Sequence, residues 1–195
     1  MSFVEYPITD LDPPRKRMTV ASFLGMWEDG VDRMLLDGEV WEVGSMIKTP
    51  LHGAIAATVV TCLGNWLKNQ PVPRGSLHVG NTGFQLDETS IVGVDIGYAT
   101  PELIAQTPPD VEIFEGPPAL AVEIRAPGDR HGPLVARIRK YLQVGTVVWD
   151  VDSDWQHVQV HRPGLPVESY NITQELVGDP YLPGFRVAVA GFFAD

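Results

Sequence analysis

A strand–helix–strand unit over residues 119–151 constrains the fold of this chain more than any other feature of its sequence. The apolar run Ala119–Ile124 predicts a buried strand, Pro133–Val144 predicts a helix, and Val147–Val151 predicts a second strand. A longer helix is expected over Leu51–Lys68, because apolar side chains recur there at spacings of three and four residues. Mixed strands with two substantial helices predict an α/β or α+β domain, in which helices flank a mixed β-sheet.

Additional β-hairpins are expected on either side of this unit. Asp37-Gly38 separates two apolar runs, and glycine accepts the positive φ that a tight hairpin turn requires. A second hairpin is expected near Asp152–Asp154. Since the sequence contains no internal repeat and no low-complexity tract, we expect residues 1–17 to be an irregular lead-in and residues 18–195 to form a single domain.

Composition excludes several classes of protein. The 195 residues carry 14 Lys and Arg against 25 Asp and Glu, and the net charge of −11 argues against a tight, nonspecific binder of nucleic acid. Cys62 is the single cysteine, which excludes a disulfide framework and a cysteine-rich zinc site. Because the chain has neither a signal-peptide pattern nor a membrane-spanning apolar run, we expect a cytoplasmic protein with no membrane partner.

Two carboxylates interrupt strands that are otherwise apolar. Asp95 lies in the run Ile91–Tyr98 with a glycine two residues away on each side, and Glu123 interrupts the run Leu120–Arg125. Two carboxylates on neighbouring strands can share a magnesium ion, since Mg²⁺ takes one or two carboxylates and keeps water molecules for its substrate. The alternative is that each carboxylate pairs with an arginine in a structural ion pair.

The segment that follows Glu123 is basic. Five of the 14 basic residues fall within residues 125–140: Arg125, Arg130, Arg137, Arg139 and Lys140. A helical projection places Arg137 at the edge of the apolar face of its helix, from which it can reach Glu123. Arg139 and Lys140 are expected to face solvent. A positive field beside an acidic pair suits a phosphodiester substrate, although a solvated helix face would give the same pattern.

Short motifs recur in a fixed order over nearly the whole chain. They are Met18-Thr19-Val20, Leu36-Asp37-Gly38-Glu39, Pro50 with His52, Gly83-Phe84, Val94-Asp95-Ile96, Val122-Glu123-Ile124 with Ala126-Pro127, Leu134 with Arg137, Tyr141 and Gly145, Trp149-Asp150-Val151-Asp152, and Pro183-Gly184-Phe185. This ordered set resembles the Uma-type (Uma-two) restriction endonuclease family, a bacterial group with the PD-(D/E)XK nuclease-like fold.

The resemblance implies a restriction-endonuclease-like mixed sheet flanked by helices and a metal-dependent endonuclease activity. Asp95 and Glu123 would bind Mg²⁺ or Mn²⁺, and Arg137 takes the position of the family's catalytic lysine. Such a metal ion lowers the pKa of its bound water and offsets the charge that develops on the phosphate. The implied substrate is nucleic acid, with DNA favoured and RNA left as an alternative, bound weakly without metal. The implied assembly is a homodimer.

Several further residues are candidates for this site. Glu39 is a candidate third catalytic acid, with an exposed residue after a hairpin turn as the equally weighted alternative. The candidates for contact with nucleic acid are Arg125, Arg130, His131 and Lys140. His131 would touch phosphate or cap the helix, whereas His52 is expected to be a structural hydrogen-bonding residue. Asp110 is an alternative first acid, but it lies in a proline-rich loop, and we prefer Asp95.

Two departures from the family pattern support a different class of function. Arg137 keeps the charge of the family's lysine but cannot readily give up a proton. Pro133 stands where the family usually has an acidic residue. The alternative hypothesis is therefore a catalytically degenerate nuclease-fold module for binding or assembly. A third, weaker alternative is a structural oligomer with a sealed Asp95–arginine pair.

Overall fold

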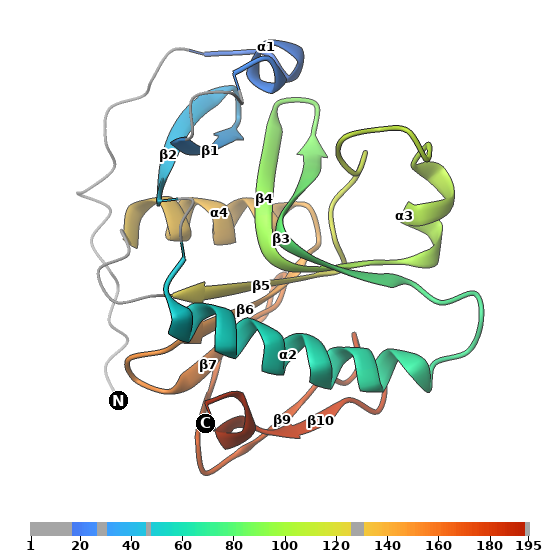
Figure 1. The fold of residues 1–195 in the computed structure, drawn as a ribbon, viewed down its shortest axis with the longest axis vertical. Helices are drawn as coiled ribbons and strands as arrows, with labels where there is room; N and C mark the ends of the chain where they lie inside the picture. Colours follow the sequence, from blue (N-terminus) through green and yellow to red (C-terminus); the bar gives the residue numbers. More distant parts are fainter. Residues whose placement is uncertain (1–16, 27–30, 46–47, 126–130, 194–195) are drawn as a thin grey trace.

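A computed structural model describes residues 17–26, 31–45, 48–125 and 131–193 of this chain (Figure 1). Its helices are α1 (Val20–Leu24), α2 (Pro50–Lys68), α3 (Pro101–Gln106), α4 (His131–Gln143) and the 3₁₀ helix η3 (Val189–Phe192). Its strands are β1 (Val31–Leu36), β2 (Glu39–Ser45), β3 (Ser76–Asp87), β4 (Ser90–Ala99), β5 (Leu120–Arg125), β6 (Val147–Asp152), β7 (His157–His161), β8 (Glu168–Asn171), β9 (Glu175–Val177) and β10 (Arg186–Ala188).

The fold is built on a mixed, eight-stranded sheet. Its strand order is β2-β1-β4-β5-β6-β7-β8, and β3 also pairs with β4. Strands β5 and β6 are parallel, whereas the other pairs of this sheet are antiparallel. Helix α4 connects the two parallel strands. The predicted strand–helix–strand unit and the predicted mixed sheet with flanking helices are thus confirmed.

Helices α2 and α4 cover opposite faces of the sheet. Val122 and Trp149 pack in a cluster with residues of α2, whereas their chain neighbours Ala121 and Val148 pack with residues of α4. This division follows from the geometry of strands, in which successive side chains point to opposite faces. The sheet is therefore the middle layer between the two helices (Figure 1).

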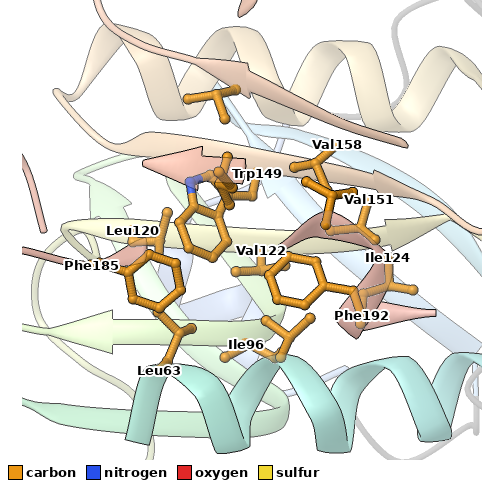
Figure 2. Close-up of a cluster of buried hydrophobic side chains, with 14 of the residues drawn as sticks. Leu63, Ile96, Leu120, Val122, Ile124, Trp149, Val151, Val158, Phe185 and Phe192 are labelled. Carbon is orange, nitrogen blue, oxygen red and sulfur yellow. The ribbon is translucent and has the colours of Figure 1, made fainter. Parts of the chain in front are cut away.

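The larger hydrophobic cluster lies on the α2 face of the sheet. Figure 2 shows Trp149 and Val122 pointing toward Leu63 of α2, with Phe185 and Phe192 from the C-terminal part of the chain closing the cluster. All five side chains are at most 2% exposed. Burial of each large side chain of this kind stabilises a fold by about 1.5–3 kcal/mol, so this cluster anchors α2 firmly against the sheet.

The start of α2 is fixed by its own residues. The Thr49 side chain accepts a hydrogen bond from the backbone N–H of His52 at 3.2 Å, and Pro50 occupies the first turn. Proline is favoured there because its missing N–H would have no partner inside the helix. His52 in this first turn is buried, although the residues on either side of it are exposed. None of the described helices is both long and apolar enough to cross a membrane.

Both predicted hairpins form. Asp37 and Gly38 have φ values of 51° and 77° between the antiparallel strands β1 and β2. Asp152 ends β6 and accepts hydrogen bonds from the backbone N–H groups of Asp154 and Trp155, both at 2.9 Å, before the chain returns as β7.

The expectation that Lys140 faces solvent is wrong. Lys140 is only 6% exposed, and its ammonium forms ion pairs with Asp37, at 2.5 Å, and with Asp87. These carboxylates belong to the β1–β2 and β3–β4 turns, which lie over this side of α4. A helical projection considers α4 alone, and so it cannot show that the turns of two distant hairpins would surround the ammonium.

Candidate functional site

Glu123 is the centre of a buried polar cluster between β5 and α4. Its side chain is 2% exposed, and Nη2 of Arg137 lies 2.6 Å from Oε2. The hydroxyl of Tyr141 donates a hydrogen bond of 2.9 Å to Oε1. Arg137 and Tyr141 are one turn apart on α4, so the helix presents both side chains to the same strand. The structure thus brings Arg137 to Glu123, as the helical projection predicts.

Burial dominates the electrostatics of this cluster. It raises the pKa of Glu123 to about 8, although Arg137 and Tyr141 both favour the ionised form and Asp95 adds a like charge. For Arg137, burial alone would lower the pKa, but the carboxylate of Glu123 raises it above the usual value. Burial and Glu123 together raise the pKa of Tyr141 well above its usual value. Arg137 is therefore charged at neutral pH, and Glu123 lacks full compensation for its own charge.

Asp95 lies on β4, the strand next to β5. Its Oδ2 accepts a 2.9 Å hydrogen bond from the backbone N–H of Ile124, the residue that follows Glu123. Burial would raise the pKa of Asp95, but His52, the Ile124 N–H and the charge of Arg137 together lower it. Asp95 is consequently an ionised carboxylate at neutral pH, held beside the other acid.

His52 approaches Asp95 from the first turn of α2. Its Nε2 lies 3.2 Å from Oδ2 of Asp95. This distance suits an ion pair, but the approach lacks hydrogen-bond geometry, and Nε2 has no hydrogen-bond partner within the part of the chain that the structure describes. The structure therefore places a buried imidazole nitrogen of His52 against the carboxylate of Asp95.

A third carboxylate, which the sequence did not reveal, borders the cluster. Asp32 on β1 is buried, and its Oδ1 accepts a 3.1 Å hydrogen bond from Nδ2 of Asn81. Its Oδ2 lies 4.0 Å from Nζ of Lys48. The charge of Asp32 contributes to the raised pKa of Arg137. Within the sequence, Asp32 is simply a polar residue at the start of an apolar strand, and only the pairing of β1 with β4 brings it near the site.

Gly93 makes room for this arrangement. A Cβ atom at Gly93 would lie 2.0 Å from Oδ1 of Asn81, far inside van der Waals contact. Asn81 itself has a φ of 65° at an irregularity between Val79 and Thr82, where the pairing of β3 with β4 shifts register. The bulge aims the Asn81 amide at Asp32, and the glycine allows the amide to stay there.

Two predicted contacts for nucleic acid are already paired with carboxylates of the protein. Arg125 contacts Asp150 at 2.7 Å through Nε and Asp152 at 3.1 Å through Nη2. Lys140 is held by the two turn carboxylates described above. A phosphate group would have to compete with these carboxylates for either cation.

The other predicted site residues either have no contact with Asp95 or Glu123 among the described residues or lie outside the described residues. His131 is exposed at the first residue of α4, and Arg130 lies outside the described residues. Glu39 begins β2 opposite Leu36 and forms a backbone bridge with Arg17. Between described residues, no hydrogen bond or ion pair joins Glu39 to Asp95 or Glu123. Asp110 is exposed in the loop after α3.

The donor chemistry of the cluster fits a hard divalent cation. Asp95 and Glu123 offer carboxylate oxygens on adjacent strands, and Mg²⁺ binds proteins through one or two carboxylates while it keeps several water molecules. A structural zinc site needs more protein ligands, and the described residues contain no group of three or more His, Cys, Asp or Glu arranged to hold a metal ion. The pair therefore fits a magnesium-type site that is completed by water and substrate.

Comparison with known proteins supports a nuclease-like fold. The family model described as "Uma2: Putative restriction endonuclease" matches residues 21–190. Among solved structures, a putative nuclease belonging to DUF820 from Anabaena variabilis superimposes with a TM-score of 0.77 at 19% sequence identity. The match covers 90% of this chain and 97% of that one, and at this identity it shows the fold. No curated protein matches the chain.

Proposed function

This chain belongs to the Uma2 family, described as putative restriction endonucleases, and we propose that it is a metal-dependent endonuclease that hydrolyses phosphodiester bonds of nucleic acid. The observation that carries the proposal is the position of the two acids on neighbouring strands. Asp95 of β4 accepts a hydrogen bond from the backbone N–H of Ile124, the residue after Glu123 on β5, and Arg137 lies against Glu123.

Asp95 and Glu123 would hold the metal ion, Mg²⁺ or Mn²⁺. When bound, such an ion supplies a water of lowered pKa and offsets negative charge on the phosphate. Asp95 suits this role because its carboxylate is ionised at neutral pH. Tyr141 fixes one oxygen of Glu123 by its hydrogen bond, and this would hold the carboxyl group in one orientation for a metal ion.

Arg137 would supply fixed positive charge rather than move a proton. Its guanidinium stays charged at any pH at which the protein is folded, and it is buried against Glu123. A preorganised cation in a dry site stabilises charge that develops on a phosphate more strongly than it would in water.

The proposed substrate is DNA rather than RNA, and we propose that it binds weakly without metal. The net charge of −11 repels phosphates and keeps binding weak, and the contacts that cations of the site make with phosphates should weaken steeply with salt, because binding releases counterions. We also propose a homodimer, which the molar mass from light scattering tests directly.

Cleavage assays test the proposal. The protein is incubated with DNA or RNA in Mg²⁺ or Mn²⁺, beside Glu123→Gln, which keeps the shape of the side chain and removes its charge. The matched control is Glu175→Gln, the same change at a half-exposed carboxylate on β9. We expect Glu123→Gln to lower the rate by about 10²-fold or more and the control to leave it unchanged. Absence of cleavage by the unchanged protein, or equal rates for both variants, would overturn the proposal.

A second candidate function is a catalytically degenerate nuclease-fold module for binding or assembly. It is favoured by Arg137, which replaces the family's lysine and is locked in an ion pair with one of the two acids. Arg137→Lys separates the two functions. Cleavage that appears only in this variant would support the degenerate module, whereas cleavage by the unchanged protein supports the enzyme.

A further inference from the structure

A lysine that belongs to none of the family motifs lies at the same cluster of acids. Lys48 immediately precedes Thr49, the N-cap of α2, and the first turn of that helix also carries His52. Nζ of Lys48 lies 4.0 Å from Oδ2 of Asp32. Its charge also helps to lower the pKa of Glu123, against the stronger effect of burial. The ammonium is therefore within electrostatic reach of Asp32 and Glu123.

The other described cations near Glu123 are held by closer carboxylates. Arg137 contacts Glu123 at 2.6 Å, Arg125 contacts two aspartates, and Lys140 is buried between two more. Lys48 is more exposed than these cations and lies farther from its carboxylate. Its side chain is 39% exposed, and the distance to Asp32 is at the limit of an ion pair. An ammonium on a flexible four-carbon stem can turn from such a loose contact toward an incoming anion.

The surroundings keep this ammonium at the site. Asp32 is itself fixed by Asn81, and Gly93 leaves the space that Asn81 occupies. At its other end, Lys48 is tied to α2, whose first turn is capped by Thr49 and packed against Asp95 through His52. Lys48 therefore links the start of α2 to Asp32 of β1.

We propose that Lys48 is the phosphate-binding cation of this site and contacts the substrate phosphate while Arg137 remains with Glu123. This inference rests on the proposed function. It assigns to the chain segment before α2 the compact positive charge that the family carries on the α4 helix. Asp32 and Asn81 are then positioning residues, because they act on the phosphate only through the ammonium.

Lys48→Met tests the proposal by binding, and Lys68→Met is the matched control. Both changes remove one positive charge, but Lys68 lies at the far end of α2, about 27 Å along the helix from its first residue. Fluorescence anisotropy with a labelled DNA duplex in EDTA measures Kd between about 50 and 200 mM salt. We expect Lys48→Met to weaken binding about tenfold at the lowest salt and to reduce the salt slope by about 0.9, as loss of one phosphate contact would.

The cleavage assay in Mg²⁺ separates this inference from the proposed function. We expect Lys48→Met to lower the rate by about 10²-fold, with a melting temperature close to that of the unchanged protein because the ion pair is partly exposed. If Lys48→Met and Lys68→Met have the same salt slope and the same rate, Lys48 is not the phosphate cation, even where cleavage depends on Glu123. If Lys48→Met changes the slope but nothing is cleaved, Lys48 binds phosphate in a protein that is not a nuclease. Absence of DNA binding at low salt overturns both.

Discussion

Replacement of Glu123 by glutamine is predicted to remove a large pH dependence from the stability of this protein. Burial raises the pKa of Glu123 from 4.5 to about 8 in the folded chain. A carboxyl group with a raised pKa binds its proton more tightly in the folded state than in the unfolded state. Its contribution to stability is therefore fully present below pH 4.5 and is lost as the pH rises toward 8.

The magnitude follows from these two pKa values. Within the window, each pH unit lowers the free energy of unfolding by about 1.4 kcal/mol, because the unfolded chain has lost the proton and the folded chain retains it. Between pH 4.5 and pH 7 the protein thus loses on the order of 3 kcal/mol of stability, because Glu123 ionises in the unfolded chain and stays protonated in the folded chain. Glutamine does not titrate. Any other effect of the substitution on stability stays constant over this window, since neither the glutamine nor Arg137 changes its charge there.

Urea denaturation in EDTA, at several values between about pH 5 and pH 8, measures this effect. The quantity of interest is the free energy of unfolding of the unchanged protein minus that of Glu123→Gln. We expect this difference to fall steadily with pH, while Glu175→Gln gives a curve parallel to that of the unchanged protein. Parallel curves for Glu123→Gln, or a difference that rises with pH, would show that Glu123 is ionised in the folded state and would refute the reasoning.

Two further predictions concern the residues that hold the site in place. Lys140→Met should destabilise the fold by about 0.5–1 kcal/mol in urea denaturation, because two ion pairs with exposed carboxylates are lost, whereas Arg139→Met on the exposed side of α4 should change little. Equal effects would contradict the ion pairs. Gly93→Ala should lower the free energy of unfolding by about 1–2 kcal/mol, because the new Cβ displaces Asn81. Gly53→Ala, where a Cβ atom meets no neighbouring atom within 4 Å, should raise it by about 0.5–1 kcal/mol through better helix propensity in α2. The same sign for both glycine variants would argue against the close contact at Gly93.

The framework of the site follows from local sequence patterns. Two apolar runs flank a segment with helical periodicity, and this pattern predicts the parallel strands β5 and β6. The segment between them is long enough for the single connecting helix α4. The projection of α4 predicts the contact between Arg137 and Glu123, since it depends only on which face of the helix meets the sheet. Asp95 was identifiable because a carboxylate within an apolar strand needs a partner.

The remainder of the site depends on contacts between distant parts of the chain. Lys140 meets Asp37, which is 103 residues away in the sequence, so nothing near Lys140 indicates that it is buried. Asp32 joins the cluster because the sheet order places β1 beside β4, and Lys48 because α2 begins next to Asp95. Neither the strand order nor the entry angle of a helix is encoded in local periodicity, so the sequence does not indicate that Asp32 and Lys48 border the cluster.

Binding of one divalent metal ion by Asp95 and Glu123 can be seen in a crystal soaked in Mn²⁺ and measured for anomalous scattering, beside a crystal of Asp95→Asn. We expect a single strong peak between the carboxyl groups of Asp95 and Glu123 in the unchanged protein, and its loss in the variant. No peak at this position, or a peak that persists in Asp95→Asn, would show that the two acids do not share a metal ion.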